Sequence, residues 1–236
     1  MAMLEVDELS YSYGAAQAIR GISLDVEEGE IVVLIGANGA GKTTTVENII
    51  GLYTPDQGTV HFEGEDVTGL GPHEMAERGV ALVPEKRRIF DAMTVEENLS
   101  MGAYSKRAKA GRAGNLERVY ELFPRLEERL DQRSGTMSGG EKQMLSMARG
   151  LMTDPELLIL DEPSLGLMPE LVDAVFEIIE HIVDEGVTVL LVEQNVQQSL
   201  DIADRGYVME NGEVRLAKAA DDLLQDEHVK ESYLGL

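Results

Sequence analysis

The sequence predicts an α/β fold with a parallel sheet covered by helices on both faces. Three apolar runs, at residues 31–35, 157–160 and 187–192, have the length and composition of buried strands. Between the last two, apolar residues recur at helical spacing from about Pro169 onwards. Apolar strands that alternate with amphipathic helices are typical of a parallel sheet with both faces buried.

The amino-terminal part of the chain predicts short strands joined by turns. Residues 22–26 alternate apolar and polar side chains, which is the pattern of a half-buried strand. A helix is expected from about Thr43 to Gly51, and a further strand from Thr59 to Phe62 after a turn at residues 54–58.

The central part changes to a helical pattern. It runs from Thr94 to about Met152 and opens with a capping box formed by Thr94 and Glu97. The basic, glycine-containing stretch 105–114 interrupts it, and we expect a mobile loop there rather than a binding segment. Near the end, residues 207–216 predict a hairpin with an Asn-Gly turn, followed by two short helical stretches.

A glycine-rich loop directly after the strand at residues 31–35 predicts that the chain binds a nucleoside triphosphate. Glycines let backbone N–H groups surround phosphate oxygens at the positive end of the next helix. Lys42 would reach the β- and γ-phosphates of ATP, and the Thr43 hydroxyl would coordinate Mg²⁺. A chance glycine-rich turn is the alternative, which the strand-loop-helix context disfavours. The loop residues are Gly36, Ala37, Asn38, Gly39, Ala40, Gly41, Lys42, Thr43 and Thr44.

Two carboxylates follow the strand at residues 157–160. Ligands of parallel sheets gather at the carboxyl ends of the strands, so Asp161 and Glu162 are expected to face the glycine loop. Asp161 suits the Mg²⁺ shell, and Glu162 suits a base that polarises the attacking water. A solvated Asp-Glu pair is the alternative, and it would be preferred if no phosphate loop were present.

The segment Ser138, Gly139, Gly140 and Glu141 predicts a capped helix start with an unusual composition. Ser138 is expected to be the N-cap and Glu141 its capping-box partner. Two glycines in a first helical turn are costly, and they leave bare amides at a positive helix end. A phosphate from a nucleotide on another subunit would fill this receptor.

Composition limits the setting of the protein. The net charge is −24, with 44 acidic and 20 basic residues, which argues against a nucleic-acid partner. High salt screens such repulsion, so we expect a salt-loving host, with an ordinary acidic protein as the alternative. There are no cysteines for disulfides, thiolate metal sites or thiol catalysis. No apolar run approaches the ~18 residues of a spanning helix, and residues 1–5 lack a signal-peptide layout, so we expect a cytoplasmic protein.

These motifs together are similar in order and spacing to the ATP-binding-cassette (ABC) family, over essentially the whole chain. The resemblance implies a P-loop NTPase fold of the ABC-ATPase type in one domain, residues 1–236. Residues 1–84 and 153–236 would form a RecA-like core with an N-terminal antiparallel β-subdomain, and about 85–152 an inserted α-helical subdomain. Two such domains would dimerise head to tail, with each ATP between the glycine loop of one and Ser138 to Glu141 of the other.

The resemblance also assigns individual roles, some at positions that depart from the family pattern. Tyr13 falls where the family places the aromatic residue that stacks on adenine, although a plain strand tyrosine is the alternative. Glu85 replaces the usual glutamine, Met168 the usual aspartate, and Gln194 the usual switch histidine. Glu162, Gln194 and Glu85 are therefore the expected catalytic residues. Thr43, Asp161 and Glu85 are the expected Mg²⁺ ligands. The histidines of the chain are His61, His73, His181 and His228, and none of them is close enough in sequence to replace Gln194.

With the motifs at residues 123–126, 163–167 and 229–235, these departures resemble the second ATPase subunit of branched-chain amino-acid importers. The ATPase of a urea or amide importer is the alternative. Either implies separate permease subunits and attachment to the inner face of the cell membrane through them. It also implies an external solute-binding protein, which would act on this chain only indirectly. The permease would dock near residues 85–94, where Ile89, Phe90 and Met93 offer apolar surface. Glutamine cannot carry the titratable charge of histidine, so we expect a heterodimer with a homologous subunit that has the histidine.

Two other classes of function fit the sequence less well. A non-transport ABC ATPase would carry tandem cassettes, long coiled-coil insertions or a basic face, and this sequence has none of them. A P-loop kinase would transfer phosphate to a substrate other than water, and the Ser138 to Glu141 segment argues against it.

The net charge gives a first testable prediction. Raising KCl from about 0.1 M to about 2 M should raise the unfolding midpoint strongly, because screening relieves repulsion between carboxylates. Thermal unfolding followed by circular dichroism measures it. A midpoint that stays flat or falls over this range would contradict the halophile interpretation.

Overall fold

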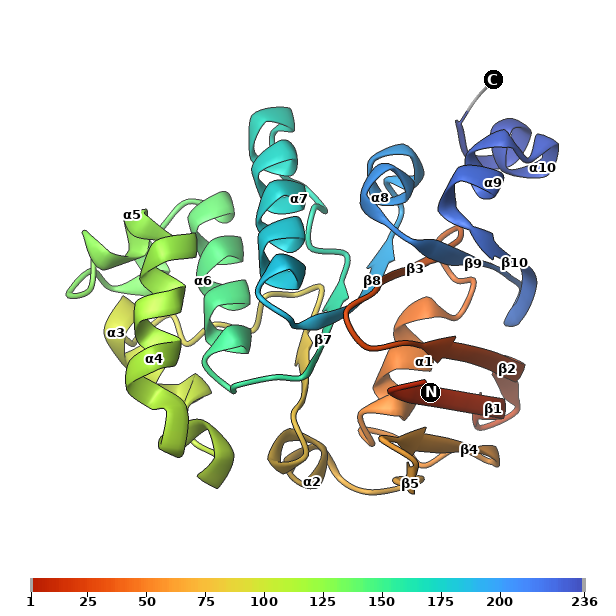
Figure 1. Ribbon diagram of the computed structural model, residues 1–236, viewed down its shortest axis with the longest axis horizontal. Helices are drawn as coiled ribbons and strands as arrows, with labels where there is room; N and C mark the ends of the chain where they lie inside the picture. The colour runs from red at the N-terminus through yellow and green to blue at the C-terminus, as the bar shows by residue number, and fades with distance from the viewer. Residues whose placement is uncertain (1, 235–236) are drawn as a thin grey trace.

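The computed structural model describes residues 2–234, and its framework is a six-stranded sheet (Figure 1). Met1, Gly235 and Leu236 lie outside the described residues, so the last glycine of the terminal motif is not covered. The strand order is β10-β9-β3-β8-β7-β6. All neighbours are parallel except the hairpin of β9 and β10. The strands are β3 (Ile31–Ile35), β6 (Val80–Val83), β7 (Leu157–Asp161), β8 (Thr188–Glu193), β9 (Arg205–Glu210) and β10 (Glu213–Ala219).

Strand β3 divides the interior into two apolar cores. Val33 packs with the helical lobe and with α7 (Pro169–Asp184), whereas Val32 and Leu34 pack with the amino-terminal sheet. This follows from the two-residue period of a strand, which turns successive side chains to opposite faces. Because every β3 side chain is apolar and buried, the strand is covered on both faces, as the sequence predicts.

The amino-terminal region forms a separate antiparallel sheet with the order β2-β1-β4-β5. Helix α1 (Lys42–Ile49) contacts both β1 and β7, so it lies between the two sheets (Figure 1). The strands are β1 (Leu4–Tyr13), β2 (Ala16–Val26), β4 (Gln57–Phe62) and β5 (Glu65–Asp66).

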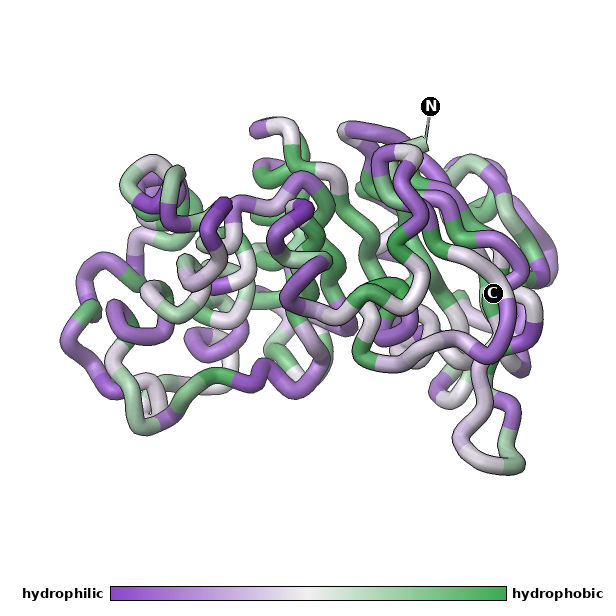
Figure 2. Tube along the Cα trace, turned by 90° about the horizontal axis from the view of Figure 1, so that it is seen from below, coloured by the Kyte–Doolittle hydropathy of each residue, from purple (hydrophilic) through white to green (hydrophobic). Residues whose placement is uncertain are grey.

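A helical lobe lies beside the sheets, and its strongest helix pair is α3 (Val95–Gly102) with α6 (Gly139–Leu151) (Figure 1). Both expected capping boxes are present, at Thr94 and at Ser138. Figure 2 shows the hydrophobic stretches gathered in the central strands and hydrophilic ones along the periphery. The remaining elements are α2 (Pro72–Glu77), α5 (Pro124–Glu127), the 3₁₀ turn Ser134–Thr136, α8 (Val196–Ile202), α9 (Ala220–Gln225), α10 (Glu227–Val229) and a π-helical turn Lys230–Leu234.

The loop expected at residues 105–114 is wrong, because helix α4 (Lys106–Leu122) covers this stretch. The Ser105 hydroxyl caps it by accepting the Ala108 N–H at 3.0 Å. Arg107 anchors the first turn through its Nε, which donates to the Asp154 carbonyl at 2.8 Å. Glycine costs a helix only about 1 kcal/mol relative to alanine. The cap, the anchor and the helix-forming alanines and basic residues outweigh the two glycines.

The expected hairpin near the end of the chain is confirmed. Strands β9 and β10 pair across Asn211 and Gly212, whose φ angles of 52° and 83° are those of a type I′ turn. The hairpin brings Met209 back onto the glycine loop, where a Cβ on Gly36 would lie only 2.4 Å from the Met209 carbonyl oxygen.

The turn after α1 gives a stability prediction. A Cβ on Gly51 would lie 1.6 Å from the Leu70 carbonyl oxygen, and the φ angle there is +72°. Gly51→Ala should therefore lower the free energy of unfolding by about 3 kcal/mol or more. Gly114→Ala is the matched control, because nothing lies within 4 Å of its Cβ position. It should stabilise the protein by about 0.5–1 kcal/mol. Urea unfolding measures both, and equal stabilities would contradict the prediction.

Candidate active site

The carboxyl ends of β3, β7 and β8 meet at one edge of the six-stranded sheet, beside a cleft of about 490 Å³. The cleft contains most of the residues that sequence analysis singled out for nucleotide binding. The lining residues are Gln17, Ala18, Arg20, Asn38, Gly39, Gly41, Lys42, Thr43, Thr44, Glu85, Glu162, Leu165, Gln194 and Asn211.

The Lys42 side chain is folded back over the glycine loop. It is 4% exposed, and its Nζ donates to the Gly36 carbonyl at 2.7 Å. The same ammonium lies 3.4 Å from Glu162 Oε1. A buried ammonium needs such partners because it has lost its hydration. Lys42 is therefore fixed at the place where the sequence predicts the phosphates.

Asp161 lies at the end of β7 and is 2% exposed. Burial raises its pKa to about 6, the negative charges of Glu162 and Glu85 add to the rise, and the hydrogen bond from Thr43 Oγ1 opposes it. That bond has an oxygen-oxygen distance of 3.4 Å. A buried carboxylate beside two others is a strong acceptor for a cation.

The donors at this point fit Mg²⁺. The Thr43 hydroxyl and the Asp161 carboxylate are hard oxygen donors, which this ion prefers. Within residues 2–234 no group of three or more acidic or histidine side chains is close enough to hold a metal ion alone. Mg²⁺ commonly uses one or two carboxylates and completes its shell with water and substrate phosphates. The two residues would hold the ion in that way.

Glu162 is held by Gln194. The Gln194 Nε2 donates to both Glu162 carboxylate oxygens at 2.7 Å and also to Asn38 Oδ1 in the glycine loop. The Glu162 φ angle is 50°, a left-handed conformation that non-glycine residues seldom adopt. The structure thus brings the expected base, the switch glutamine and the glycine loop into direct contact. None of the described histidines lines this cleft.

Glu193 is a site residue that the sequence analysis missed. Its carboxylate is buried beside the cleft, where it accepts the N–H groups of Ser164 at 2.9 Å and Gln194 at 3.0 Å. It therefore joins the loop after Glu162 to the end of β8. The sequence signal that could have identified Glu193 is an acidic residue at the end of an apolar strand.

Tyr13 is not among the residues that line the cleft. It is 46% exposed, and its hydroxyl lies 3.4 Å from the Thr44 hydroxyl. Its ring packs edge-on against Tyr11 and Tyr53, with centroids 5.0 Å and 5.5 Å away. The ring therefore stands beside the glycine loop, and its adenine-stacking role stays a prediction.

The Ser138 to Glu141 segment lies outside the cleft, at the start of α6. The Ser138 Oγ accepts the Glu141 N–H at 3.3 Å, and Glu141 Oε2 accepts the Ser138 N–H at 2.8 Å. Gly139 is exposed, but Gly140 is buried, because a Cβ there would lie 2.3 Å from Leu171 Cδ1. Only one of the two glycines therefore leaves backbone open to solvent. The other lies against Leu171 of α7, whose side chain would have to shift to make room for a larger residue.

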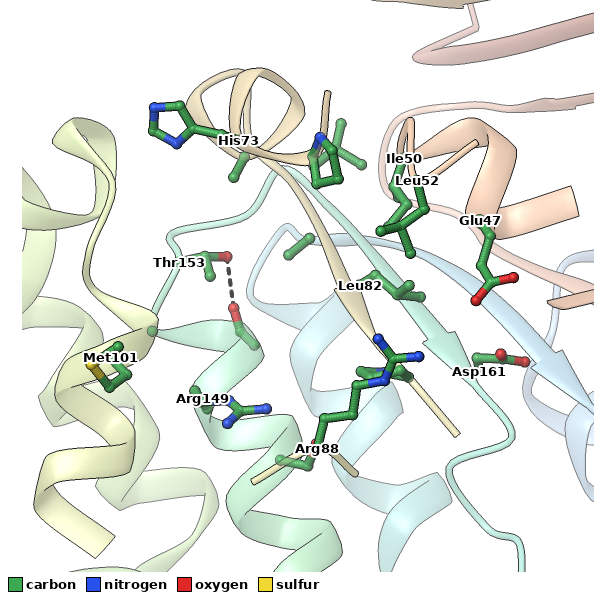
Figure 3. Close-up of a pocket in the computed structure, with 18 of the residues that line it drawn as sticks. Glu47, Ile50, Leu52, His73, Leu82, Arg88, Met101, Arg149, Thr153 and Asp161 are labelled. Carbon is green, nitrogen blue, oxygen red and sulfur yellow. Dashed lines mark hydrogen bonds between the residues drawn. The ribbon is translucent and has the colours of Figure 1, made fainter. Parts of the chain in front are cut away.

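A second hollow of about 510 Å³ lies next to the cleft and shares Thr43 and Glu85 with it, and Asp161 lines its wall (Figure 3). Of the three apolar residues expected to offer a docking surface, only Phe90 lines it. Phe90 is 42% exposed, and its ring centroid lies 5.2 Å from the Arg149 guanidinium. Ile89 and Met93 are not among the lining residues, because both are partly buried and Ile89 packs against the core. The docking role expected for those two stays a prediction.

The family model for ABC transporters matches residues 19–165. The chain is 49% identical to BraG of Pseudomonas aeruginosa, a high-affinity branched-chain amino acid transport ATP-binding protein, across 99% of this chain and 100% of BraG. It is 34% identical to LivF of Archaeoglobus fulgidus, a probable branched-chain amino acid transport ATP-binding protein, across 99% of both chains. It is 35% identical to LptB of Escherichia coli, a lipopolysaccharide export ATP-binding protein, across 100% of this chain and 98% of LptB.

Solved structures show the same architecture. A nucleotide-free ATP-binding cassette from an ABC transporter superposes with a TM-score of 0.85 at 28% identity, and the match covers all of both chains. An ATP-binding cassette in its ADP conformation gives a TM-score of 0.84 at 28% identity, again over all of both chains. The ABC-ATPase fold implied by the sequence is confirmed.

Proposed function

The chain belongs to the ABC transporter family of ATPases, and we propose that it is the ATP-hydrolysing subunit of an importer for branched-chain amino acids. The observation that carries the substrate class is the 49% identity to BraG, which extends over 99% of this chain and all of BraG. The identity to the lipopolysaccharide-export subunit LptB is only 35%, against 49% to BraG. An importer for branched-chain amino acids is therefore the better supported interpretation.

The cleft supports specific roles in ATP hydrolysis. Lys42 and the loop residues from Gly36 to Thr44 bind the phosphates, while Thr43 and Asp161 would hold Mg²⁺. That ion would offset phosphate charge. Glu162 accepts a proton from the attacking water, and Gln194 keeps both oxygens of that carboxylate aimed into the cleft through its two 2.7 Å hydrogen bonds. Glu85 faces the same space and is the third candidate around the water and the metal.

The position of Ser138 to Glu141 supports a dimer. Within the described residues this segment does not line the chain's own cleft, yet Gly139 in its first turn is exposed at a helix start. ATP bound to a second, homologous subunit would bring phosphate to it. Gln194 in place of histidine supports a heterodimer in which the partner has the histidine. We propose a division into a core of residues 1–84 and 153–236 and a lobe of about 85–152. The glycine loop then belongs to the core, and the Ser138 to Glu141 segment belongs to the lobe.

The hollow beside the cleft is the proposed docking groove for a permease subunit. No described helix has the length and hydropathy to cross a membrane, so in this proposal the transmembrane part belongs to other chains. Figure 3 shows Arg88 and Arg149 reaching into the hollow, with Ile50 and Leu52 on the opposite wall. A short helix with one apolar face and acidic ends would fit. The subunit would then sit on the inner face of the membrane, with an external solute-binding protein on the other side.

The substrate class is tested by purifying the transporter through a tagged copy of this chain and measuring uptake into proteoliposomes with its binding protein. Leucine, isoleucine or valine should drive uptake and stimulate ATP hydrolysis. Stimulation by urea or a short amide instead would replace the proposed substrate.

Two variants separate binding from hydrolysis. Lys42→Ala should weaken ATP binding by about 10- to 100-fold, because a charge-assisted contact to phosphate is lost. Glu162→Gln should still bind ATP and accumulate as a nucleotide-bridged dimer, because only the proton acceptor is removed. Fluorescent-nucleotide titration and gel filtration with ATP measure these effects, with Lys218→Ala as a control outside the cleft. A Glu162→Gln protein that does not bind ATP would contradict the assignment.

The heterodimer gives a second comparison within the assembled transporter. Ser138→Arg should lower solute-stimulated ATP hydrolysis by roughly 100-fold, because it blocks the receptor for the partner's ATP. Gln194→Ala should cost less, since it affects the weaker of the two sites. If Gln194→Ala causes the larger loss, its hydrogen bonds to Glu162 make this chain's own site fully competent, and the asymmetry is wrong.

A further inference from the structure

The segment that follows β6 is held in an uncommon backbone conformation. Arg87 and Arg88 have φ angles of 57° and 41°, so two successive residues with Cβ atoms are left-handed. Such conformations persist only where surrounding contacts fix them, and they cluster at functional positions. Here the contacts come from α6: Ser146 Oγ donates to the Arg87 carbonyl at 2.8 Å, and Arg149 Nη2 donates to the same oxygen at 3.2 Å.

The Arg87 side chain joins two further parts of the molecule. Its Nε donates to Gln143 Oε1 in α6 at 3.0 Å, and its Nη2 donates to the Leu165 carbonyl at 3.3 Å. Leu165 belongs to the loop that follows Glu162. The guanidinium also lies against the helix start, because a Cβ on Gly139 would be 3.3 Å from Arg87 Nη1. One side chain therefore connects the exposed glycine of the Ser138 to Glu141 segment with the loop after the expected base.

We propose that Arg87 is a positioning residue for ATP hydrolysis: it fixes the start of α6 relative to the loop after Glu162. This inference rests on the proposed function, because it assumes that these two elements act on nucleotide at a subunit interface. Arg87 itself does not line the cleft, so it acts through Gln143 and Leu165. Gln143 is 2% exposed, which makes it a rigid anchor.

Arg87 also lies beside the proposed docking groove. Its neighbour Arg88 lines the groove, as do Ser146 and Arg149, which hold the Arg87 carbonyl (Figure 3). The Arg87 side chain donates to two uncharged acceptors, Gln143 Oε1 and the Leu165 carbonyl. Its hydrogen bonds are therefore easier to rearrange than ion pairs. A permease segment that displaced the left-handed backbone at Arg87 and Arg88 would consequently move the Arg87 side chain and, with it, the start of α6.

The test measures kcat and KM for ATP in the transporter purified through a tagged full-length chain. Arg87→Ala should lower kcat about tenfold with KM changed by less than about twofold, because groups are misplaced while the phosphate loop is untouched. Arg87→Lys should be intermediate, since an ammonium can replace one donor of the fork but not both. Gln143→Met, which keeps the volume and removes the acceptor, should resemble Arg87→Ala.

The double variant Arg87→Ala with Gln143→Met separates positioning from general damage. If both act through one contact, its kcat should match that of Arg87→Ala alone. Multiplied losses, a kcat of Arg87→Ala within about twofold of wild type, or a KM that rises in proportion would each overturn the inference. Should Arg87→Ala not fold, Arg87→Lys and Gln143→Met carry the test. Arg215→Ala, which removes an exposed arginine whose ion-pair partner is Glu213, is the charge control. A wild-type complex without ATPase activity would instead refute the proposed function.

Discussion

The arrangement of the site depends on one buried ammonium group, that of Lys42. An ammonium that is 4% exposed must be compensated by nearby oxygens, and here they are the Gly36 carbonyl and the Glu162 carboxylate. These oxygens stand at the ends of β3 and β7, which are separated in the sheet by β8. The end of β8 supplies Gln194, which bonds to Glu162 from the other side. The strand order therefore sets the distances on which the charge balance rests.

Two features of the site fit groups that would come from outside the chain. Burial, together with the negative charges of Glu162 and Glu85, raises the pKa of Asp161 at the place where polyphosphate would add more negative charge. A divalent cation resolves that conflict, and the Thr43 hydroxyl is positioned to share it. Within the described residues, the start of α6 does not line the cleft, and in the proposed dimer it would meet the nucleotide of the partner subunit. The proposed Mg²⁺ and the proposed partner would both come from outside the chain.

Sequence patterns predicted the elements whose signal is local. The strand-loop-helix around Lys42, the capping boxes at Thr94 and Ser138, and the Asn211-Gly212 hairpin all depend on neighbouring residues and were predicted correctly. The misses depend on distant contacts. Helix α4 is stabilised by Arg107 reaching Asp154, Gly140 packs against Leu171, and Glu193 accepts an amide N–H from the loop after Glu162. No window of sequence contains both halves of such a pair. The mutual placement of Gln194 and Glu162 likewise needed the folded sheet, although both residues were identified as candidates.

The pairing of β3 has a consequence for the order in which this protein is made. The strand that carries the glycine loop pairs only with β8 and β9 in the six-stranded sheet, and the Met209 carbonyl closes against Gly36. A ribosome that has delivered the loop must therefore add more than half of the chain before that loop has its supporting strands. Until then this strand lacks its hydrogen-bonding neighbours in the sheet, which leaves the nascent chain more open to chaperones and to aggregation. Nascent chains carry the sequence of the loop early but complete the strands around it late.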